Sequence, residues 1–119
     1  MNERQDLDEA VFEELRHIGG DQFAGEIFTL FLDIAPVKIE EAVGGIKRGD
    51  LEMIERAIHS LKSSAGHIGA QRLQELCGQI EILATEKNSE SLAPLIDQLE
   101  ETFARARARL EKVRNAATP

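Results

Sequence analysis

The chain has very few of the residues that covalent cross-links and base-stacking surfaces require. Cys77 is the only cysteine, and the 119 residues include no tryptophan and no tyrosine. A single cysteine excludes an intrachain disulfide, and the apolar helical pattern around Cys77 predicts a small core residue rather than a reactive thiol. With five phenylalanines as the only aromatic side chains, platforms for stacked bases are also scarce.

Basic residues are also fewer than acidic residues. Lysine and arginine number 14 against 22 aspartates and glutamates, which gives a net charge of −8. Nucleic-acid binding needs a basic footprint, so this balance argues against a DNA or RNA partner. Arg105, Arg107 and Arg109 form the one basic cluster, but alternate positions on a helix spread over a wide arc and make no compact patch.

Long apolar runs and strand patterns are missing. No run approaches the twenty or so apolar residues of a membrane span, so we expect no membrane association. The polar, acidic start of the chain is unlike a secretory signal, and together with the single cysteine this predicts a cytoplasmic protein.

We expect residues 1–119 to form one domain and a monomer, with 1–5 and 115–119 frayed.

Apolar residues instead recur at helical spacing along almost the whole chain, which predicts an all-α fold. Glycine pairs, prolines and capping residues divide this pattern into segments. The segments expected to be helical are 7–17 (capped by Asp6 and ended by Gly19 and Gly20), 21–48 (capped by Asp21), 51–66 (capped by Asp50), 70–87 and 92–114 (capped by Ser91).

Two prolines add detail to this pattern. Ala35, the residue before Pro36, resists the α region, so the second helix should be kinked or broken there. Pro94 falls in the first turn if Ser91 is the cap, whereas a cap at Ser89 would place it deeper, at a cost of about 3 kcal/mol. The expected architecture is an antiparallel up-and-down four-helix bundle with a short N-terminal helix packed on it.

One of these helices carries a second face beside its apolar stripe. His59, Lys62, Ser63 and Gly66 recur at i, i+3, i+4 and i+7, one position round from the apolar residues. Small residues around a nucleophile and a cation indicate clearance for a group that approaches the imidazole. A boundary histidine with a satisfied ring is the commoner cause of such spacing, and spacing alone does not exclude it. The apolar stripe is formed by Ile54, Ile58, Leu61 and Ala65.

Residues 59–70 resemble the motif of the histidine-containing phosphotransfer (HPt) domains, His-x-x-Lys-Gly-Ser/Ala-Ser/Ala-x-x-hydrophobic-Gly-Ala. The one departure is Ser63, where the family usually has glycine; serine is small, and we expect it to be tolerated. The Leu-x-x-Leu-Cys pattern that ends at Cys77, the chain length and the helical pattern extend the resemblance over nearly the whole chain. The matching positions are His59, Lys62, Ser64, Ala65, Ile68, Gly69 and Ala70.

The resemblance implies the same four-helix bundle and a role as a phosphorelay intermediate. His59 would accept a phosphoryl group from an aspartate of a receiver domain and pass it to another receiver domain. Lys62 would offset charge on the phosphoryl oxygens. Glu81, with Gln79 as the alternative, would accept a hydrogen bond from the ring and orient it. Because Ser63 and Gly66 place no bulk beside the imidazole, we expect these two residues to form a docking surface.

No cofactor or metal of the chain's own is expected. The sequence has neither a Gly-x-x-x-x-Gly-Lys-Ser/Thr loop nor a Gly-x-Gly-x-x-Gly loop, so it shows no means of binding ATP and is not expected to be a kinase. The resemblance places Mg²⁺ on the partner receiver domain of a response regulator or hybrid kinase.

Two other interpretations stay open. A metal site could draw on His17, His59, His67 and carboxylates, but no His-x-x-x-His pair supports it, and a helix end is expected between His59 and His67. A helical bundle that binds partners in a signalling complex without phosphotransfer would fit the same periodicity.

Overall fold

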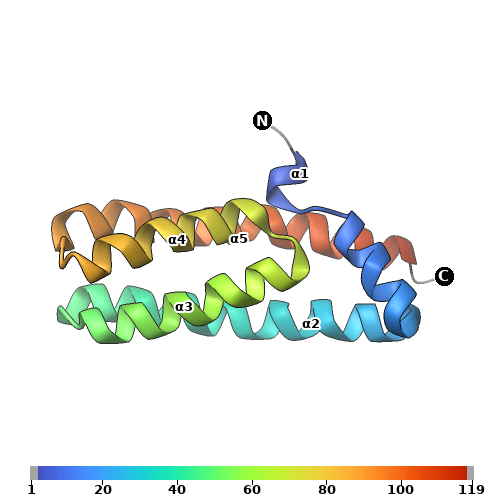
Figure 1. Ribbon diagram of the computed structural model, residues 1–119, viewed down its shortest axis with the longest axis horizontal. Coiled ribbons are helices and arrows are strands. Elements are labelled where there is room, and N and C mark those ends of the chain that lie inside the picture. Colours follow the sequence, from blue (N-terminus) through green and yellow to red (C-terminus); the bar gives the residue numbers. More distant parts are fainter. Residues whose placement is uncertain (1–2, 118–119) are drawn as a thin grey trace.

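The computed structural model describes residues 3–117, and its long helices form an antiparallel bundle crossed by a short N-terminal helix (Figure 1). The all-α four-helix bundle expected from the periodicity is therefore confirmed, and the described residues include no strand. The helices are α1 (Glu3–Asp6), α2 (Ala10–Arg48), α3 (Leu51–Ile68), α4 (Gln71–Thr85) and α5 (Ser89–Ala117).

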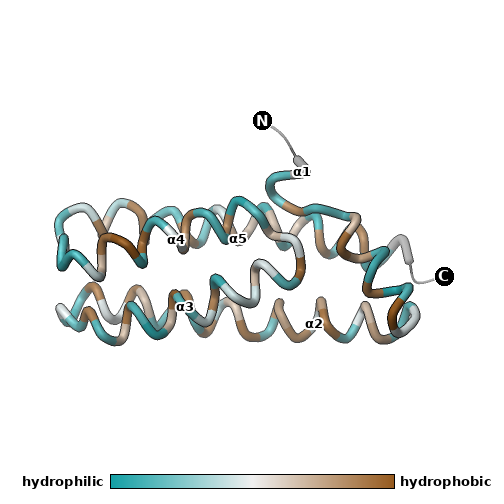
Figure 2. The backbone as a smooth tube through the Cα atoms, viewed as in Figure 1, coloured by the Kyte–Doolittle hydropathy of each residue, from teal (hydrophilic) through white to brown (hydrophobic). Residues whose placement is uncertain are grey.

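The four long helices pack in a ring, with α2 against α3, α3 against α4, α4 against α5, and α5 back against α2. Apolar and polar residues alternate along each helix (Figure 2), so that each helix turns one apolar side inward. Two tilted phenylalanine pairs lie in the core: the ring centroids of Phe12 and Phe28 are 4.8 Å apart, and those of Phe31 and Phe103 are 5.8 Å apart. Such tilted pairs add to the stabilisation that burial alone provides.

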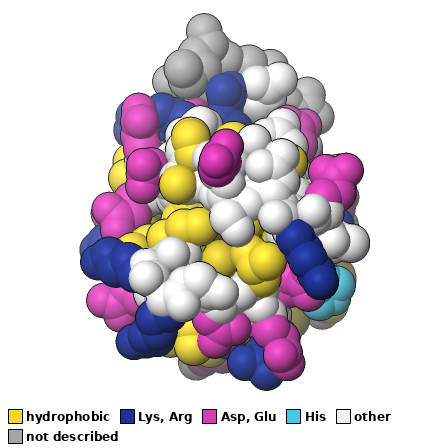
Figure 3. Space-filling view, turned by 90° about the vertical axis from the view of Figure 1, so that its left-hand side faces the viewer, with side chains coloured by type: hydrophobic (Ala, Val, Ile, Leu, Met, Phe, Trp, Pro, Cys, Tyr) yellow, Lys and Arg dark blue, Asp and Glu magenta, His cyan; other side chains and the backbone are white. Residues whose placement is uncertain are grey.

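Seen from the end that carries the α2–α3 and α4–α5 connections, the bundle shows apolar side chains at its centre (Figure 3). Acidic and basic side chains lie to the left, to the right and below this centre in the view. The charged residues thus lie on the outer faces of the helices, as expected for a bundle with one apolar core.

The start of the chain differs from the expected helix at 7–17. Residues 3–5, expected to be frayed, form α1 together with Asp6, and α2 begins only at Ala10, after a Glu9 cap that makes no side-chain hydrogen bond. Asp6 is not a cap: its Oδ1 lies 3.1 Å from Nε of Arg72 and 3.5 Å from Nε of Arg105. This buried contact with two distant residues fixes α1, and local spacing gives no sign of it.

The α2 helix is interrupted at Gly20, where φ is 90° and ψ is 177°, a combination open essentially to glycine alone. The expected break at the glycine pair is therefore confirmed, and the segment before it folds across the end of the bundle (Figure 1). Of the kink or break expected at Pro36, the structure excludes the break, because the backbone stays helical through this residue. Ala35 and Ile39 are buried on either side of the proline, and their packing outweighs the lost backbone hydrogen bond.

The helix that bears His59 begins where the sequence predicts. Asp50 is its N-cap, and Oδ1 of Asp50 accepts a hydrogen bond of 3.1 Å from the backbone N–H of Met53. The helix continues to Ile68, two residues past the expected end at Gly66, and Gly69 ends it in the left-handed conformation with φ 81°.

The last helix begins three residues earlier than expected. Asn88, not Ser91, acts as the cap, because its Oδ1 accepts a hydrogen bond of 3.3 Å from the backbone N–H of Ser91. Pro94 therefore lies inside α5, and the carbonyl that it leaves unpaired belongs to exposed Glu90, where water can reach it. Leu92 is fully buried and holds this first turn on the core. The helix continues to Ala117, so residues 115–117 are helical and 118–119 lie outside the described residues.

Candidate phosphoacceptor site

His59 stands on the outer face of α3 with one ring nitrogen held and the other free. Its side chain is 79% exposed, and Nδ1 lies 2.8 Å from Oε1 of Glu81 on α4. An ionised carboxylate can only accept hydrogen bonds, so Nδ1 carries the proton and donates it. The lone pair then remains on Nε2, which is the nitrogen on the solvent side of the ring.

Glu81 also binds the lysine one turn further along α3. Its second oxygen, Oε2, accepts a hydrogen bond of 3.2 Å from Nζ of Lys62. One carboxylate from α4 therefore joins two side chains of α3 that are three residues apart. Of the two candidates on α4 considered from the sequence, the structure brings Glu81 to the ring, whereas Gln79 is exposed.

The ionisation of Glu81 reflects this bridge. Partial burial by itself would raise the pKa of the carboxyl, but the hydrogen bonds and positive charges of His59 and Lys62 outweigh burial and lower the pKa from its ordinary value of 4.5. A carboxyl with a lowered pKa stabilises the fold at pH values above its ordinary pKa. That contribution is lost as the pH falls through the lowered pKa.

We expect Lys62→Met to raise the pKa of Glu81, because the variant removes one hydrogen bond and one positive charge from the carboxylate. A ¹³C NMR titration of the Glu81 carboxyl carbon measures the change directly. Lys112→Met, which removes an exposed lysine from α5, should leave the Glu81 titration where it is. An unchanged Glu81 titration in Lys62→Met would contradict the contact between Lys62 and Glu81.

The close approach of α3 and α4 explains one of the two small residues that follow His59 on its face of α3. A Cβ on Gly66 would lie 2.6 Å from Nε2 of Gln74, so the glycine leaves room for the side chain of α4 that packs over it. Ser63, by contrast, is exposed on the same face as His59. The open surface beside the ring therefore belongs to Ser63 more than to Gly66.

The corner between α3 and α4 is held by the N-terminal segment. The carbonyl of Gly69 accepts a hydrogen bond of 2.8 Å from the backbone N–H of Asp8. A Cβ on Gly69 would lie 2.8 Å from Cγ2 of Val11 and 2.9 Å from the carbonyl oxygen of Asp8. Only glycine fits this corner, which fixes how α4 runs back along α3 and so where Glu81 meets His59.

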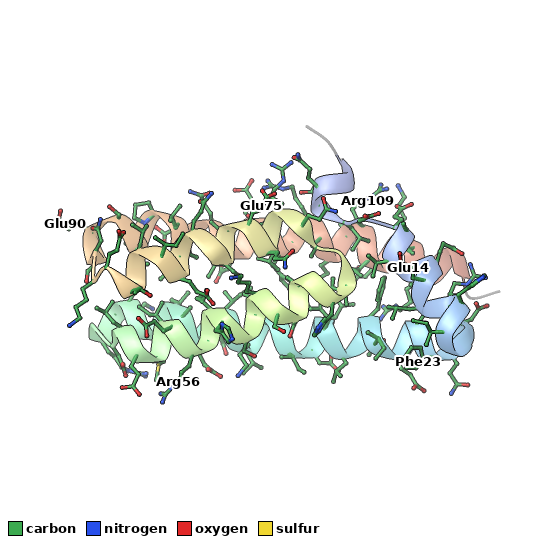
Figure 4. The ribbon with its side chains drawn as sticks, viewed as in Figure 1. Glu14, Phe23, Arg56, Glu75, Glu90 and Arg109 are labelled. Atoms are coloured by element: carbon green, nitrogen blue, oxygen red, sulfur yellow. The ribbon has the colours of Figure 1, made fainter. Side chains whose placement is uncertain are left out.

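A shallow groove lies beside the imidazole, between α3 and α4. Its one arginine, Arg56, was not singled out in the sequence analysis; it is three residues before His59 and so on a neighbouring position of the same helix. Figure 4 places Arg56 on the outer side of α3. The groove is lined by Glu55, Arg56, His59, Ser60, Glu81 and Thr85.

Cys77 lies one turn before Glu81 on α4 and is fully buried. Burial raises the pKa of its thiol to about 12, with a further contribution from the negative charge of Glu81. The thiol therefore stays protonated at neutral pH and acts as a small core residue, as the sequence predicts.

Two further observations concern residues 3–117. In this part of the chain, histidine, cysteine and acidic side chains form no group of three or more with a metal-binding arrangement. No helix in the same range is both long and apolar enough to cross a membrane.

The chain was compared with known proteins. Residues 26–109 match the model of the Hpt domain family. Histidine-containing phosphotransfer protein 5 of Arabidopsis thaliana is 24% identical over 110 residues, which cover 87% of this chain and 70% of that protein.

Solved structures show the same fold. Histidine-containing phosphotransfer protein B of Pseudomonas aeruginosa superposes with a TM-score of 0.87 at 22% identity, over 93% of this chain and 96% of that one. A histidine-containing phosphotransfer protein described as putative, from rice, gives 0.82 at 22% identity, over 94% and 81%. The HPT domain of a sensor hybrid histidine kinase from Shewanella gives 0.80 at 19% identity, over 99% and 100%.

The family match covers well over half of the chain and includes both α3 and α4, the helices that carry the His59–Glu81 contact. The relatives indicate a phosphotransfer role in two-component signalling, as a carrier of phosphoryl groups rather than a kinase. The chain belongs to the Hpt domain family.

Proposed function

We propose that this protein is a phosphorelay intermediate that accepts a phosphoryl group on Nε2 of His59 from the aspartyl phosphate of a receiver domain and passes it to a second receiver domain. The observation that supports the proposal is the 2.8 Å contact between Nδ1 of His59 and Glu81 on a ring that is otherwise open to solvent. This contact fixes the tautomer that has its lone pair outward, and it holds the ring still.

The proposed step is an in-line displacement. The lone pair on Nε2 attacks phosphorus, the bond between phosphorus and the aspartyl oxygen breaks, and the aspartate leaves as a carboxylate. The imidazole ring gains positive charge in this step, and the proton stays on Nδ1 facing Glu81, whose carboxylate stabilises that charge. Transfer to the second receiver is the same step in reverse.

Positive charge for the phosphoryl oxygens comes from Lys62 and from the partner in this proposal. The ammonium of Lys62 lies on the same face of α3 as the ring and can turn from Glu81 toward a phosphoryl oxygen. The chain needs no ATP site of its own because the receiver brings the phosphoryl group, together with the Mg²⁺ that the receiver binds.

The test is to incubate the purified chain with a receiver domain that carries a labelled phosphoryl group, and to measure the label transferred to the chain. Phosphohistidine is labile in acid and stable in base, so label that acid removes and base does not supports the proposal. Absence of label with every receiver of the source organism would contradict it and would favour a bundle that only binds partners.

We propose that Ser63 lies on the surface that receivers contact. Because Ser63 is exposed, Ser63→Gln should change the free energy of unfolding by no more than about 0.5 kcal/mol. Transfer from the receiver should fall by about tenfold or more, since the reacting groups must come within about 3.5 Å of each other. Stopped-flow or rapid-quench transfer rates measure the effect.

Ser63→Gly is the matched control for that variant, because glycine is the commoner family residue at this position. It should transfer at the parental rate or faster. Unfolding of Ser63→Gln would show that the position is not open, and parental transfer in Ser63→Gln would show that receivers approach over another face.

A further inference from the structure

We propose that Arg56 is a second phosphoryl-binding residue, which leaves Glu52 when His59 is phosphorylated and binds the phosphoryl oxygens from the groove side of the ring. The proposal rests on the proposed function, since it concerns the phosphorylated form of His59. It adds a residue that lies before the family motif and that the motif does not contain.

The first reason is that the positive charge of Lys62 is balanced by the negative charge of Glu81. Its Nζ donates to Oε2 of Glu81 at 3.2 Å, and Oε1 of the same carboxylate holds the ring. The charges of Lys62 and Glu81 therefore cancel at the site. A phosphoryl group that carries close to two negative charges needs more positive charge than this pair supplies.

The second reason is the charge of the groove. Of its six lining residues, Arg56 is the one cation, and Glu55 and Glu81 are both acidic. If Lys62 neutralises Glu81, the groove without Arg56 has a net charge of −1 from Glu55. A phosphoryl group on His59 would then lie beside a like charge, which disfavours it. Arg56 removes this imbalance.

The third reason is that the guanidinium of Arg56 can reach the phosphoryl group and is easily released from its present partner. Side chains three residues apart on a helix have Cβ atoms about 5–6 Å apart, so the guanidinium of Arg56 can extend to oxygens on Nε2 of His59. Arg56 is only weakly held by its present partner: Nη1 of Arg56 lies 3.4 Å from Oε1 of Glu52, and the two side chains are 70% and 79% exposed. Exposed pairs of this kind contribute little stability. A phosphoryl group offers the planar guanidinium two oxygens at once.

The experiment measures the equilibrium between a phosphorylated receiver with free chain and a free receiver with phosphorylated chain. This equilibrium depends on the separated proteins and not on how tightly they dock. Arg56→Gln should shift it away from the phosphorylated chain by about two- to fivefold, the range for an exposed charge contact. Glu52→Gln, which releases Arg56, should shift it the other way.

Arg107→Gln is the matched control, because it removes the same charge from an exposed arginine on α5 that pairs with Glu111. It should leave the equilibrium unchanged. A ³¹P NMR titration of the phosphorylated chain gives a second measurement, since loss of a bound cation should raise the second pKa of the phosphoryl group in Arg56→Gln and not in Arg107→Gln.

The outcomes separate the two proposals. If the parental chain takes no label, the proposed function fails. If the parent is labelled and Arg56→Gln matches it in both the equilibrium and the ³¹P titration, the role of Arg56 is overturned while the proposed function stands. If Arg56→Gln slows transfer but leaves the equilibrium unchanged, Arg56 contacts the receiver instead, and the proposal is equally overturned.

Discussion

The variant His59→Gln is expected to fold like the parent and to accept no phosphoryl group. The side chain is 79% exposed and its one hydrogen-bonded neighbour is the half-buried Glu81, so the free energy of unfolding should change by no more than about 1 kcal/mol. Glutamine has no nucleophilic nitrogen, so the loss of labelling should be complete rather than partial. Labelling from a phosphorylated receiver and a urea melt of the same sample measure the two results.

The other two histidines supply the control. His17 on α2 and His67 near the end of α3 are both exposed, so their replacement by glutamine should also be structurally mild. Each variant should label as fully as the parent. Label that persists on His59→Gln would move the phosphoacceptor to another residue and remove the central assignment.

The second large effect concerns the core. Phe28 is fully buried and packs its ring 4.8 Å from that of Phe12, which joins the N-terminal arm of α2 to the bundle. Phe28→Ala should lower the free energy of unfolding by about 3–5 kcal/mol, because it removes a buried aromatic side chain and leaves a cavity. The whole free energy of unfolding of a native protein is only about 5–15 kcal/mol. The urea concentration at the midpoint of unfolding should therefore fall clearly.

Leu30→Ala is the matched control, since Leu30 lies two residues further along the same helix but is 54% exposed. It should cost less than about 1 kcal/mol, because most of its surface is already in water. Equal losses in Phe28→Ala and Leu30→Ala would contradict the assignment of the inward face of α2.

Periodicity was enough to predict the bundle because the core consists of regular stripes. Ile54, Ile58 and Leu61 are predicted to face inward and are fully buried. Helix starts were harder to predict where distant residues decide them. The place of Asp6 depends on Arg72 and Arg105, which are far along the chain and on different helices. Spacing within one segment contains no information about such partners.

In the site, too, the residues on one helix could be predicted from spacing, whereas contacts between helices could not. His59 and Lys62 lie on one helix, so their spacing alone places them together. Glu81 and Gln79 are two residues apart and so about 200° apart around α4. Only the packing of α4 on α3 decides which of them meets the ring, and the sequence analysis chose Glu81 by resemblance. Arg56 was missed because an exposed arginine four residues after a glutamate looks like an ordinary surface pair.

The hydrogen bond between Asp8 and Gly69 has a consequence for anyone who transplants this module into another protein. The family match begins at residue 26, inside α2 and after the bend at Gly20. A graft cut at that border would lose Phe12 and the buried Leu7, and it would uncover the corner from which α4 starts back toward His59. The transferable unit is therefore longer than the stretch by which its family is recognised, and a graft should begin ahead of α1.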